Sequence, residues 1–333
     1  IDTDNGGVPD YVEVTLYPNL GKPATDPNDA ADDGQNTDGD LLTDYEELVS
    51  GSNLNDPCDP NPCDASLSAK VFLGGAYDDV AGLMHDSLRV RSIIPLTQPY
   101  GLLSDFNYTG TETVDASVFA VTGPDAIVDW VLVELHDAND PTVVLHQRAA
   151  LVQRDGDIVD VDGVSPLTFA GAGTGDFYVS VRHRNHLGVM TEAPVTFGVT
   201  PLAVDFTQAS TPTYQLSGST GSAYAQQSLL STTRVLWPGN MANTANTGDR
   251  IIYQGAGADV EEAYFKALLD PANTNFLPNW IVLEYHRADA NMDGRVIYQG
   301  ANSDSDVVFF SVSLFPGNGG FLPNYVIFEQ IPK

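Results

Sequence analysis

The chain has 333 residues, 42% of them hydrophobic, and carries 45 acidic against 14 basic residues, for a net charge of −31. This length allows two or three domains, and the shortage of Lys and Arg excludes the phosphate-neutralising surface of a nucleic-acid-binding protein. No apolar run reaches the ~18 residues needed to span a bilayer, so we expect no membrane insertion.

The first 66 residues concentrate the charge, with 16 acidic residues and a single basic one, Lys22. Two stretches there place oxygen-bearing residues at every second position and an acidic residue at position 12, the pattern with which a loop wraps Ca²⁺. Ordinary turns also use Asp, Asn and Gly, but two full copies favour cation binding. The predicted ligands are Asp2, Asp4, Val8 (carbonyl), Asp10 and Glu13 in the first loop, and Asn36, Asp38, Asp40, Leu42 (carbonyl), Asp44 and Glu47 in the second.

Gly6 stands where such loops usually have Asp or Asn, so the first loop has one ligand fewer. The linker between the loops offers further possible ligands at Asp29, Asp32 and Asp33. The two loops and the segment that follows resemble thrombospondin type 3 repeats of secreted bacterial proteins. The resemblance covers residues 1–65 and implies a calcium-loaded spacer arm.

Two cysteines, Cys58 and Cys63, follow the second loop. A disulfide between them suits an oxidising compartment; the alternative is a pair of free thiols. The chain opens inside a motif, so we expect a piece processed from a longer precursor and located outside the cell or at its surface.

Residues 66–200 contain short apolar segments separated by turn residues, which predicts an antiparallel, immunoglobulin-like β-sandwich. Trp130 lies in the most apolar of these segments and is expected in the core. Asn107 begins an Asn-Tyr-Thr glycosylation sequon, and Ser87 lies in a stretch that resembles bacterial O-glycosylation sites. Residues 201–236 are expected to be a connector. The expected strands are 114–121, 127–135, 141–145, 149–153, 167–170, 176–181 and 194–199.

Four aspartates, Asp155, Asp157, Asp160 and Asp162, lie close together in the sandwich region. They could hold a cation, or they could simply form a polar hairpin.

Residues 237–333 contain a duplication, because residues 250–284 align without gaps on residues 295–329 with 16 of 35 positions identical. Each copy predicts a loop, a helix (260–269 and 306–315), a Pro-x-Asn turn and a second helix that begins at Pro278 or Pro323.

The loop of the second copy has calcium-loop spacing, with Gly294 at the sharp turn and Gly300 at position 12. This loop resembles that of a dockerin, and dockerins are built from two such loops in tandem. The resemblance implies Ca²⁺ and, as a possible partner, a cohesin-like protein; the repeat is longer than a dockerin's. The predicted ligands are Asp289, Asn291, Asp293, Arg295 (carbonyl) and Asp304, with Asn246, Asp249 and Asp259 in the degenerate first copy.

The predicted fold is therefore mainly β with a small α part: a calcium-loop arm, an antiparallel β-sandwich and a duplicated loop-helix-helix module. The sequence lacks the G-x-S-x-G, H-E-x-x-H, P-loop and Rossmann motifs, so we expect no enzyme. We expect an extracellular structural protein, rigidified by Ca²⁺ and self-associating in a fibre or cell-surface assembly. The alternative is a glycan- or protein-binding tail of a larger secreted hydrolase or adhesin, which exposed aromatic residues on the sandwich would favour.

Overall fold

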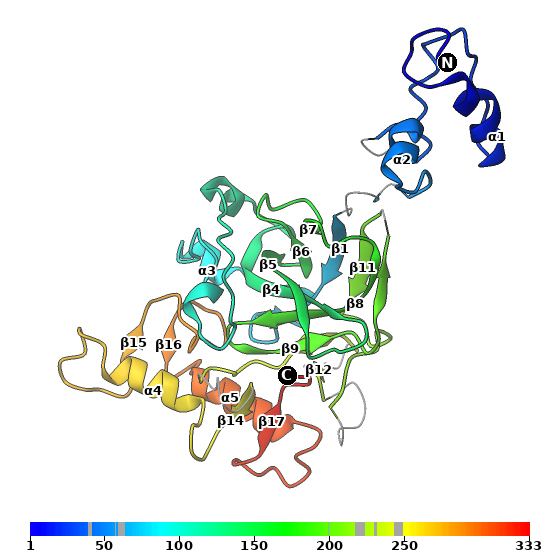
Figure 1. The fold of residues 1–333 in the computed structure, drawn as a ribbon. Helices are drawn as coiled ribbons and strands as arrows, with labels where there is room; N and C mark the ends of the chain where they lie inside the picture. The colour runs from blue at the N-terminus through cyan, green and yellow to red at the C-terminus, as the bar shows by residue number, and fades with distance from the viewer. Residues whose placement is uncertain are drawn as a thin grey trace. The chain divides into compact units, whose positions relative to one another are not determined.

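The computed structural model describes residues 1–333 except 39–41, 57, 59–63, 199, 217–223, 230–231 and 243–248. The chain divides into two compact units. The first unit comprises Ile1–Asp64 and Ala170–Thr174, and the second unit comprises Ala65–Phe169 and Gly175–Lys333. We call residues 1–64 the arm (Figure 1). The fold is mainly β with a smaller helical part, as predicted. None of the described helices is both long and apolar enough to cross a membrane.

The arm is built around a small apolar core. Its helices are a π-helical turn Val12–Leu16, α1 (Tyr17–Asn19) and α2 (Asp44–Ser50). Thr43 begins α2 with a capping box, in which its side chain and that of Glu46 bond each other's backbone amides. Residues of both loop copies contribute to the core, which consists of Val8, Val12 and Tyr17 with Leu16, Tyr45 and Leu48 packed against it.

The second unit contains one large sheet. Its hydrogen-bonded path is β10-β8-β4-β5-β6-β1-β11, with β7 on β1 and β9 on β8. All its pairs are antiparallel except β1–β11, so the sheet is compatible with the predicted β-sandwich. The strands are β1 (Ala65–Lys70), β4 (Ile127–Asp137), β5 (Val144–Gln153), β6 (Asp157–Val159), β7 (Leu167–Phe169), β8 (Gly175–His183), β9 (His186–Met190), β10 (Val195–Phe197) and β11 (Leu202–Asp205).

Central strand β4 lies in the core, with Trp130 fully buried as expected. One predicted strand is wrong here. Residues 114–121 form no strand, because Asp115 caps a 3₁₀ helix, Ala116–Ala120, through the Ser117 amide. The expected connector, residues 201–236, contributes β11 to the sheet edge beside β1. The smaller elements are β2 (Tyr77–Asp78), β3 (Leu83–Met84), α3 (Ser87–Val90), a 3₁₀ turn Tyr100–Leu102, β12 (Gln226–Ser228) and β13 (Arg234–Leu236).

The two copies of the C-terminal module (residues 237–333) interlock through their strands. The first copy's β14 pairs with the second copy's β17, and β15 pairs with β16. The two pairings are equivalent under the repeat, since Ile251 faces Ile327 and Val296 faces Val282. The elements are β14 (Arg250–Ile252), α4 (Val260–Leu268), β15 (Ile281–Val282), β16 (Val296–Ile297), α5 (Asp304–Leu314) and β17 (Val326–Phe328).

The helices α4 and α5 confirm the first predicted helix of each copy, but the second predicted helix is wrong in both. The residues after Pro278 and Pro323 form β15 and β17 instead. Their β-branched side chains favour a pleated strand, and each strand finds its partner in the other copy.

Candidate metal centre

Three carboxylates of the arm converge on one point. One oxygen each from Asp4, Glu13 and Asp33 lies within 4.8 Å of the others. Glu13 is fully buried and Asp33 is 6% exposed. Asp4 Oδ2, Glu13 Oε2 and Asp33 Oδ1 are buried without a hydrogen-bond partner. Within the described part of the chain, no other group of three His, Cys, Asp or Glu side chains converges in this way.

The second oxygen of each of these carboxylates fixes the side chain in place. Asp4 Oδ1 accepts from the Gly6 amide (2.9 Å), Glu13 Oε1 from the Thr25 hydroxyl (3.1 Å), and Asp33 Oδ2 from the Val8 amide (3.0 Å). Burial raises the pKa of Glu13; the Thr25 hydrogen bond opposes this, and the nearby Asp33 and Asp4 charges add to it. The geometry therefore offers three preoriented carboxylates, each with one uncompensated oxygen, and carboxylate oxygens are the ligands that a hard cation prefers.

Asp33 takes the place of the side chain that the first loop lacks at Gly6. A Cβ atom on Gly6 would lie 2.2 Å from Asp33 Oδ2, closer than any non-bonded contact allows. The sequence marks Asp33 only as a possible further ligand, because it lies in the linker. Two features of the sequence could have identified Asp33 as a ligand: the glycine at a usual ligand position, Gly6, and the acidic residues of the linker.

The other predicted ligands of the first loop shape the backbone. Asp2 accepts from the amides of Asn5 (2.7 Å) and Gly7 (3.2 Å). Asp10 accepts from both the amide (2.8 Å) and the hydroxyl (2.7 Å) of Thr3. The Val8 side chain lies in the arm core.

The second loop repeats the hydrogen-bonded Thr–Asp pair of the first loop 34 residues later. Asp44 accepts from the amide and the hydroxyl of Thr37, both at 2.7 Å. Glu47, the counterpart of Glu13, is also fully buried. Asp40 lies outside the described residues, so this ligand set is described only in part; Asn36, Asp38 and Leu42 each have at least one interaction.

The predicted loop of the C-terminal module satisfies the Asp289 carboxylate with its own backbone amides. Asp289 is fully buried and accepts from the amides of Asp293 (3.0 Å) and Gly294 (2.9 Å). Asn291 Oδ1 also accepts from the Asp293 amide (3.0 Å), and Gly294 has the left-handed φ of +83° that the turn predicts. Arg295 directly precedes β16. The Asp289 carboxylate thus has protein partners on both oxygens, and burial raises its pKa to about 7, whereas Asp293 Oδ1 is buried without a hydrogen-bond partner.

Asp304 and Asp259 have the same role in the two copies. Asp304 accepts from the amides of Ala290 (2.7 Å), Asn291 (3.3 Å) and Ile297 (2.7 Å). Asp259 accepts from those of Met241 (2.7 Å), Ala242 (2.8 Å) and Ile252 (2.7 Å). Because both copies keep this arrangement although their loops differ, these aspartates act as clamps between the loop and the strand. Burial raises the pKa of Asp259 to about 7.

Neighbouring residues of the same unit hold the carbonyls of the second-copy loop. Asn185 Nδ2 donates to the Asp289 carbonyl (2.6 Å), Arg91 Nε donates to the Asp293 carbonyl (2.6 Å), and His85 Nε2 lies 3.1 Å from the Asn291 carbonyl. The loop is thus anchored to residues around the sheet by its backbone.

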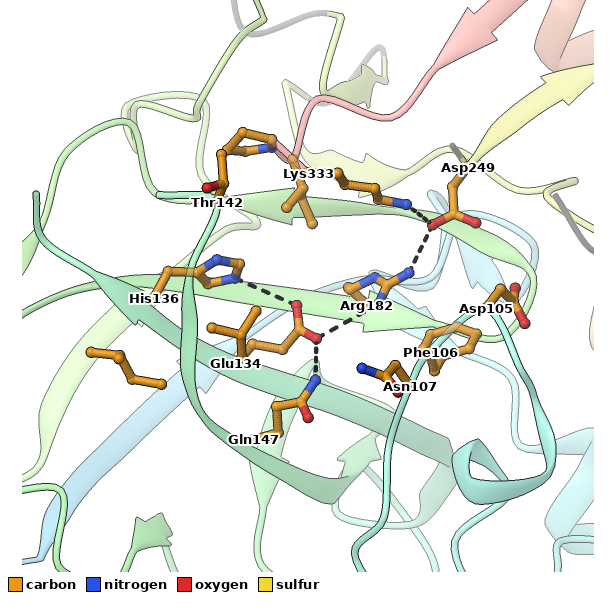
Figure 2. Close-up of a pocket in the computed structure, with 14 residues that line it drawn as sticks. Asp105, Phe106, Asn107, Glu134, His136, Thr142, Gln147, Arg182, Asp249 and Lys333 are labelled. Atoms are coloured by element: carbon orange, nitrogen blue, oxygen red, sulfur yellow. Dashed lines mark hydrogen bonds and ion pairs between the residues drawn. The ribbon is translucent and has the colours of Figure 1, made fainter. Parts of the chain in front are cut away.

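A polar cavity of about 670 Å³ lies over β4, β5 and β8 (Figure 2). Glu134 accepts from Gln147 (2.8 Å) and lies 3.6 Å from Arg182 and 3.4 Å from His136. Burial alone would raise the pKa of Glu134, but His136, Arg182 and Gln147 together lower it to about 2. Glu134 therefore stays ionised near neutral pH and is a poor proton acceptor.

Asp249, predicted as a loop ligand, belongs to this cavity. Its carboxylate pairs with Arg182 (2.7 Å) and with Lys333 (2.5 Å). Asn246 lies outside the described residues. Asn107, at the candidate glycosylation sequon, is exposed and lines the cavity.

The remaining predicted sites lie elsewhere. Ser87 is the first residue of α3, and Cys58 is disulfide-bonded, while its predicted partner Cys63 lies outside the described residues. In the aspartate cluster, Asp157 pairs with Lys70 (2.7 Å) and Asp160 with Arg148 (2.8 Å), which supports a polar hairpin.

Comparisons of the chain with protein-family models, with curated proteins and with solved structures find no match.

Proposed function

We propose that this is a non-enzymatic extracellular structural protein whose arm is stiffened by Ca²⁺, and that it is a subunit of a fibre or cell-surface assembly. The observation that carries the proposal is the convergence of three carboxylates, Asp4, Glu13 and Asp33, each of which has one buried oxygen without a hydrogen-bond donor. A buried carboxylate oxygen without a donor is unfavourable, as is the mutual repulsion of three neighbouring carboxylates, and one divalent cation would offset both.

Calcium suits the site because Ca²⁺ prefers carboxylate and carbonyl oxygens in an adaptable geometry. A cation that binds only the folded arm stabilises it by about 2.7 kcal/mol when its concentration is 100 times Kd. Even weak extracellular sites, with Kd values of ~10⁻⁴–10⁻³ M, would be occupied outside the cell. The same ions reduce the self-repulsion of an acidic arm.

The glycan-binding alternative has less support. Among the described residues 65–236, every strongly exposed large apolar side chain is aliphatic, for example Leu102 and Val164. Protein surfaces that stack sugars use aromatic rings, and this part of the chain presents none of them strongly to solvent.

The test is calorimetric titration of the full chain with CaCl₂ after chelation. We expect binding by the native protein, and at least about tenfold weaker binding at this site for Glu13→Gln and for Asp33→Asn, because each removes a charged ligand. Glu192→Gln, an exposed acidic residue of the other unit, should leave binding unchanged. Absence of binding at millimolar Ca²⁺, or unchanged binding in Glu13→Gln, would contradict the proposal.

A further inference from the structure

Two buried histidines flank the turn between β8 and β9. His183 and His186 are each only 1% exposed, and the centroids of their rings lie 4.9 Å apart. Their Nδ1 atoms are 3.0 Å apart, which is hydrogen-bond distance. Both residues lie outside the arm site and outside the lining of the polar cavity.

The surrounding hydrogen bonds determine which nitrogen of each ring carries a proton. The Gly75 amide donates to His186 Nε2 (2.9 Å), so the proton of this neutral ring lies on Nδ1. His186 Nδ1 faces two acceptors, Asn185 Oδ1 (2.8 Å) and His183 Nδ1 (3.0 Å). His183 Nδ1 is therefore unprotonated, and His183 donates from Nε2 to Asp129 Oδ2 (3.2 Å). Each histidine is thus neutral and fixed as one tautomer.

The same bonds argue against a metal ion between the two rings. A histidine that binds a metal donates a proton from its other ring nitrogen to an acceptor, whereas His186 Nε2 accepts a proton from the Gly75 amide. Among the described residues, no third His, Cys, Asp or Glu side chain completes a group with these two.

An additional proton has no favourable position on this pair. On His186 Nε2 it would face the Gly75 amide, which is itself a donor. On His183 Nδ1 it would face His186 Nδ1–H at 3.0 Å and the Asn185 amide at 3.4 Å. Either position opposes two donors in a fully buried site, which is costly. The pair therefore accepts a proton only when its surroundings open.

The charged groups around the pair come from several elements. Asp129 of β4 bonds His183 and also accepts from Arg184 Nε (3.0 Å) and the Tyr285 hydroxyl (2.7 Å). Burial lowers the pKa of His183, although Asp129 opposes this effect. Burial and the charges of His183 and Arg184 hold the pKa of His186 well below its usual value. Further titratable groups near the pair and its partners are Tyr100, His85, His286 and Asp289.

The turn between the two histidines holds the C-terminal module on the sheet. Asn185 Nδ2 donates to the Asp289 carbonyl (2.6 Å). The Asn185 carbonyl accepts from the amides of Gly239 (2.9 Å) and Asn240 (3.0 Å). Because one residue of the turn makes all three contacts, a displacement of the turn weakens them together.

Arg184, the other residue of the turn, contacts a different segment of the module. Its guanidinium donates to the His286 carbonyl and lies 4.3 Å from the centroid of the Tyr285 ring. The Tyr285 hydroxyl in turn bonds Asp129, which is bonded to His183. The histidine pair and the docked module thus share their partners.

We propose that His183 and His186 form an acid-sensitive switch that controls the docking of the C-terminal module on the sheet. The docked form keeps both rings neutral, whereas an opened form binds protons below about pH 6.5, where an exposed histidine titrates. Because the pKa of each ring is lowered in the docked form, the stabilisation is complete above about pH 6.5 and is lost as the pH falls. This inference goes beyond the proposed function and involves no cation ligand.

The first test is NMR of the imidazole nitrogens in the full chain. At neutral pH we expect His183 as the Nε2–H tautomer and His186 as the Nδ1–H tautomer. Neither ring should titrate near about pH 6.5 while the module stays docked. Titration of either ring in this range with the Gly239 amide still protected would overturn the inference, and so would the opposite tautomers.

The second test measures hydrogen-exchange protection of the Gly239 and Asn240 amides between neutral pH and about pH 5. His186→Gln keeps an acceptor for the Gly75 amide but does not titrate. It should therefore reduce the pH dependence of both protection factors by up to about tenfold per pH unit. The control His146→Gln changes a half-buried histidine of β5 and should keep the native pH dependence.

The comparison with the native protein isolates the histidines from nearby carboxyl groups. Asp289, whose pKa burial raises to about 7, contributes with the opposite sign, because its stabilisation is lost as the pH rises. The variant His186→Gln leaves that contribution in place. Equal pH dependence in the native and His186→Gln proteins would overturn the inference. If this variant does not fold, the ring NMR of the native protein decides.

Discussion

The first loop of the arm and the second loop of the C-terminal module have similar spacings of oxygen side chains, yet their carboxylates have different partners. In the arm, Asp4, Glu13 and Asp33 each leave one buried oxygen without a donor. In the module, both oxygens of Asp289 and of Asp304 accept backbone amides. A similar sequence pattern thus leaves three neighbouring carboxylates of the arm each with one oxygen that has no donor, and leaves one such oxygen, Asp293 Oδ1, in the module loop.

The difference arises from what surrounds each loop. The first arm loop is held by side-chain hydrogen bonds within the arm and by a small apolar core. The module loop is clamped by Asp304 and held through its carbonyls by Asn185 and Arg91. We therefore expect calcium to matter most in the arm, where three neighbouring carboxylates each keep an oxygen without a donor.

The largest expected effect tests the clamp. Asp304→Ala should destabilise the second unit by about 3–5 kcal/mol, because two buried amides and one partly buried amide lose their acceptor. Chemical denaturation should show the same loss with Ca²⁺ and with chelator. Asp306→Ala, an exposed residue on the same helix, should cost less than about 1 kcal/mol. A loss seen only with Ca²⁺ would instead make Asp304 a cation ligand.

The next largest effect concerns Glu134, whose carboxylate is stabilised by hydrogen bonds and ion pairs with other residues of the protein. The pKa of Glu134 is lowered from 4.5 to about 2, so its contribution, about 3 kcal/mol, is present above pH 4.5 and lost as the pH falls towards 2. Glu134→Gln should remove this part of the pH dependence, measured as the unfolding free energy of the second unit between pH 5 and pH 2. An unchanged pH profile in the variant would show that Glu134 is not stabilised in this way.

The smallest of the three effects tests how Asp33 enters the arm site. Gly6→Ala should displace Asp33 and abolish the calcium-linked stabilisation of the arm, about 2.7 kcal/mol at 100 times Kd. Gly34→Ala is the matched control, because a methyl group there meets no atom within 4 Å. Thermal unfolding of both variants with and without Ca²⁺ measures the calcium-linked stabilisation of each. A Gly6→Ala protein that responds to Ca²⁺ like the native chain would contradict the assignment of Asp33.

The sequence anticipates the local features of the arm and misses what depends on distant contacts. The spacing of Asp4 and Glu13 places them in a predicted loop, and the structure brings them together. Asp33 comes from 20 residues beyond Glu13, and only the folded linker shows that it fills the space above Gly6. Asp10 has the ligand spacing too, yet the neighbouring Thr3 takes both of its oxygens.

In the C-terminal module the duplication was evident but its consequence was not. If each 45-residue repeat folded by itself, its last apolar segment would have no strand to pair with. The proline followed by apolar residues therefore indicates a second helix. The strands β15 and β17 form instead because each copy supplies the other's partner. Pairing between distant segments overrides local signals, and a single sequence does not display it.

The most direct test of the central claim is amide hydrogen exchange of the full chain, measured with Ca²⁺ and then with chelator. The account predicts that chelation removes the protection of the amides of Gly6 and Val8, whose acceptors are Asp4 and Asp33. It predicts little change at Gly294 and Ile297, whose acceptors are Asp289 and Asp304. Equal loss of protection in both loops, or an arm unaffected by chelation, would contradict it.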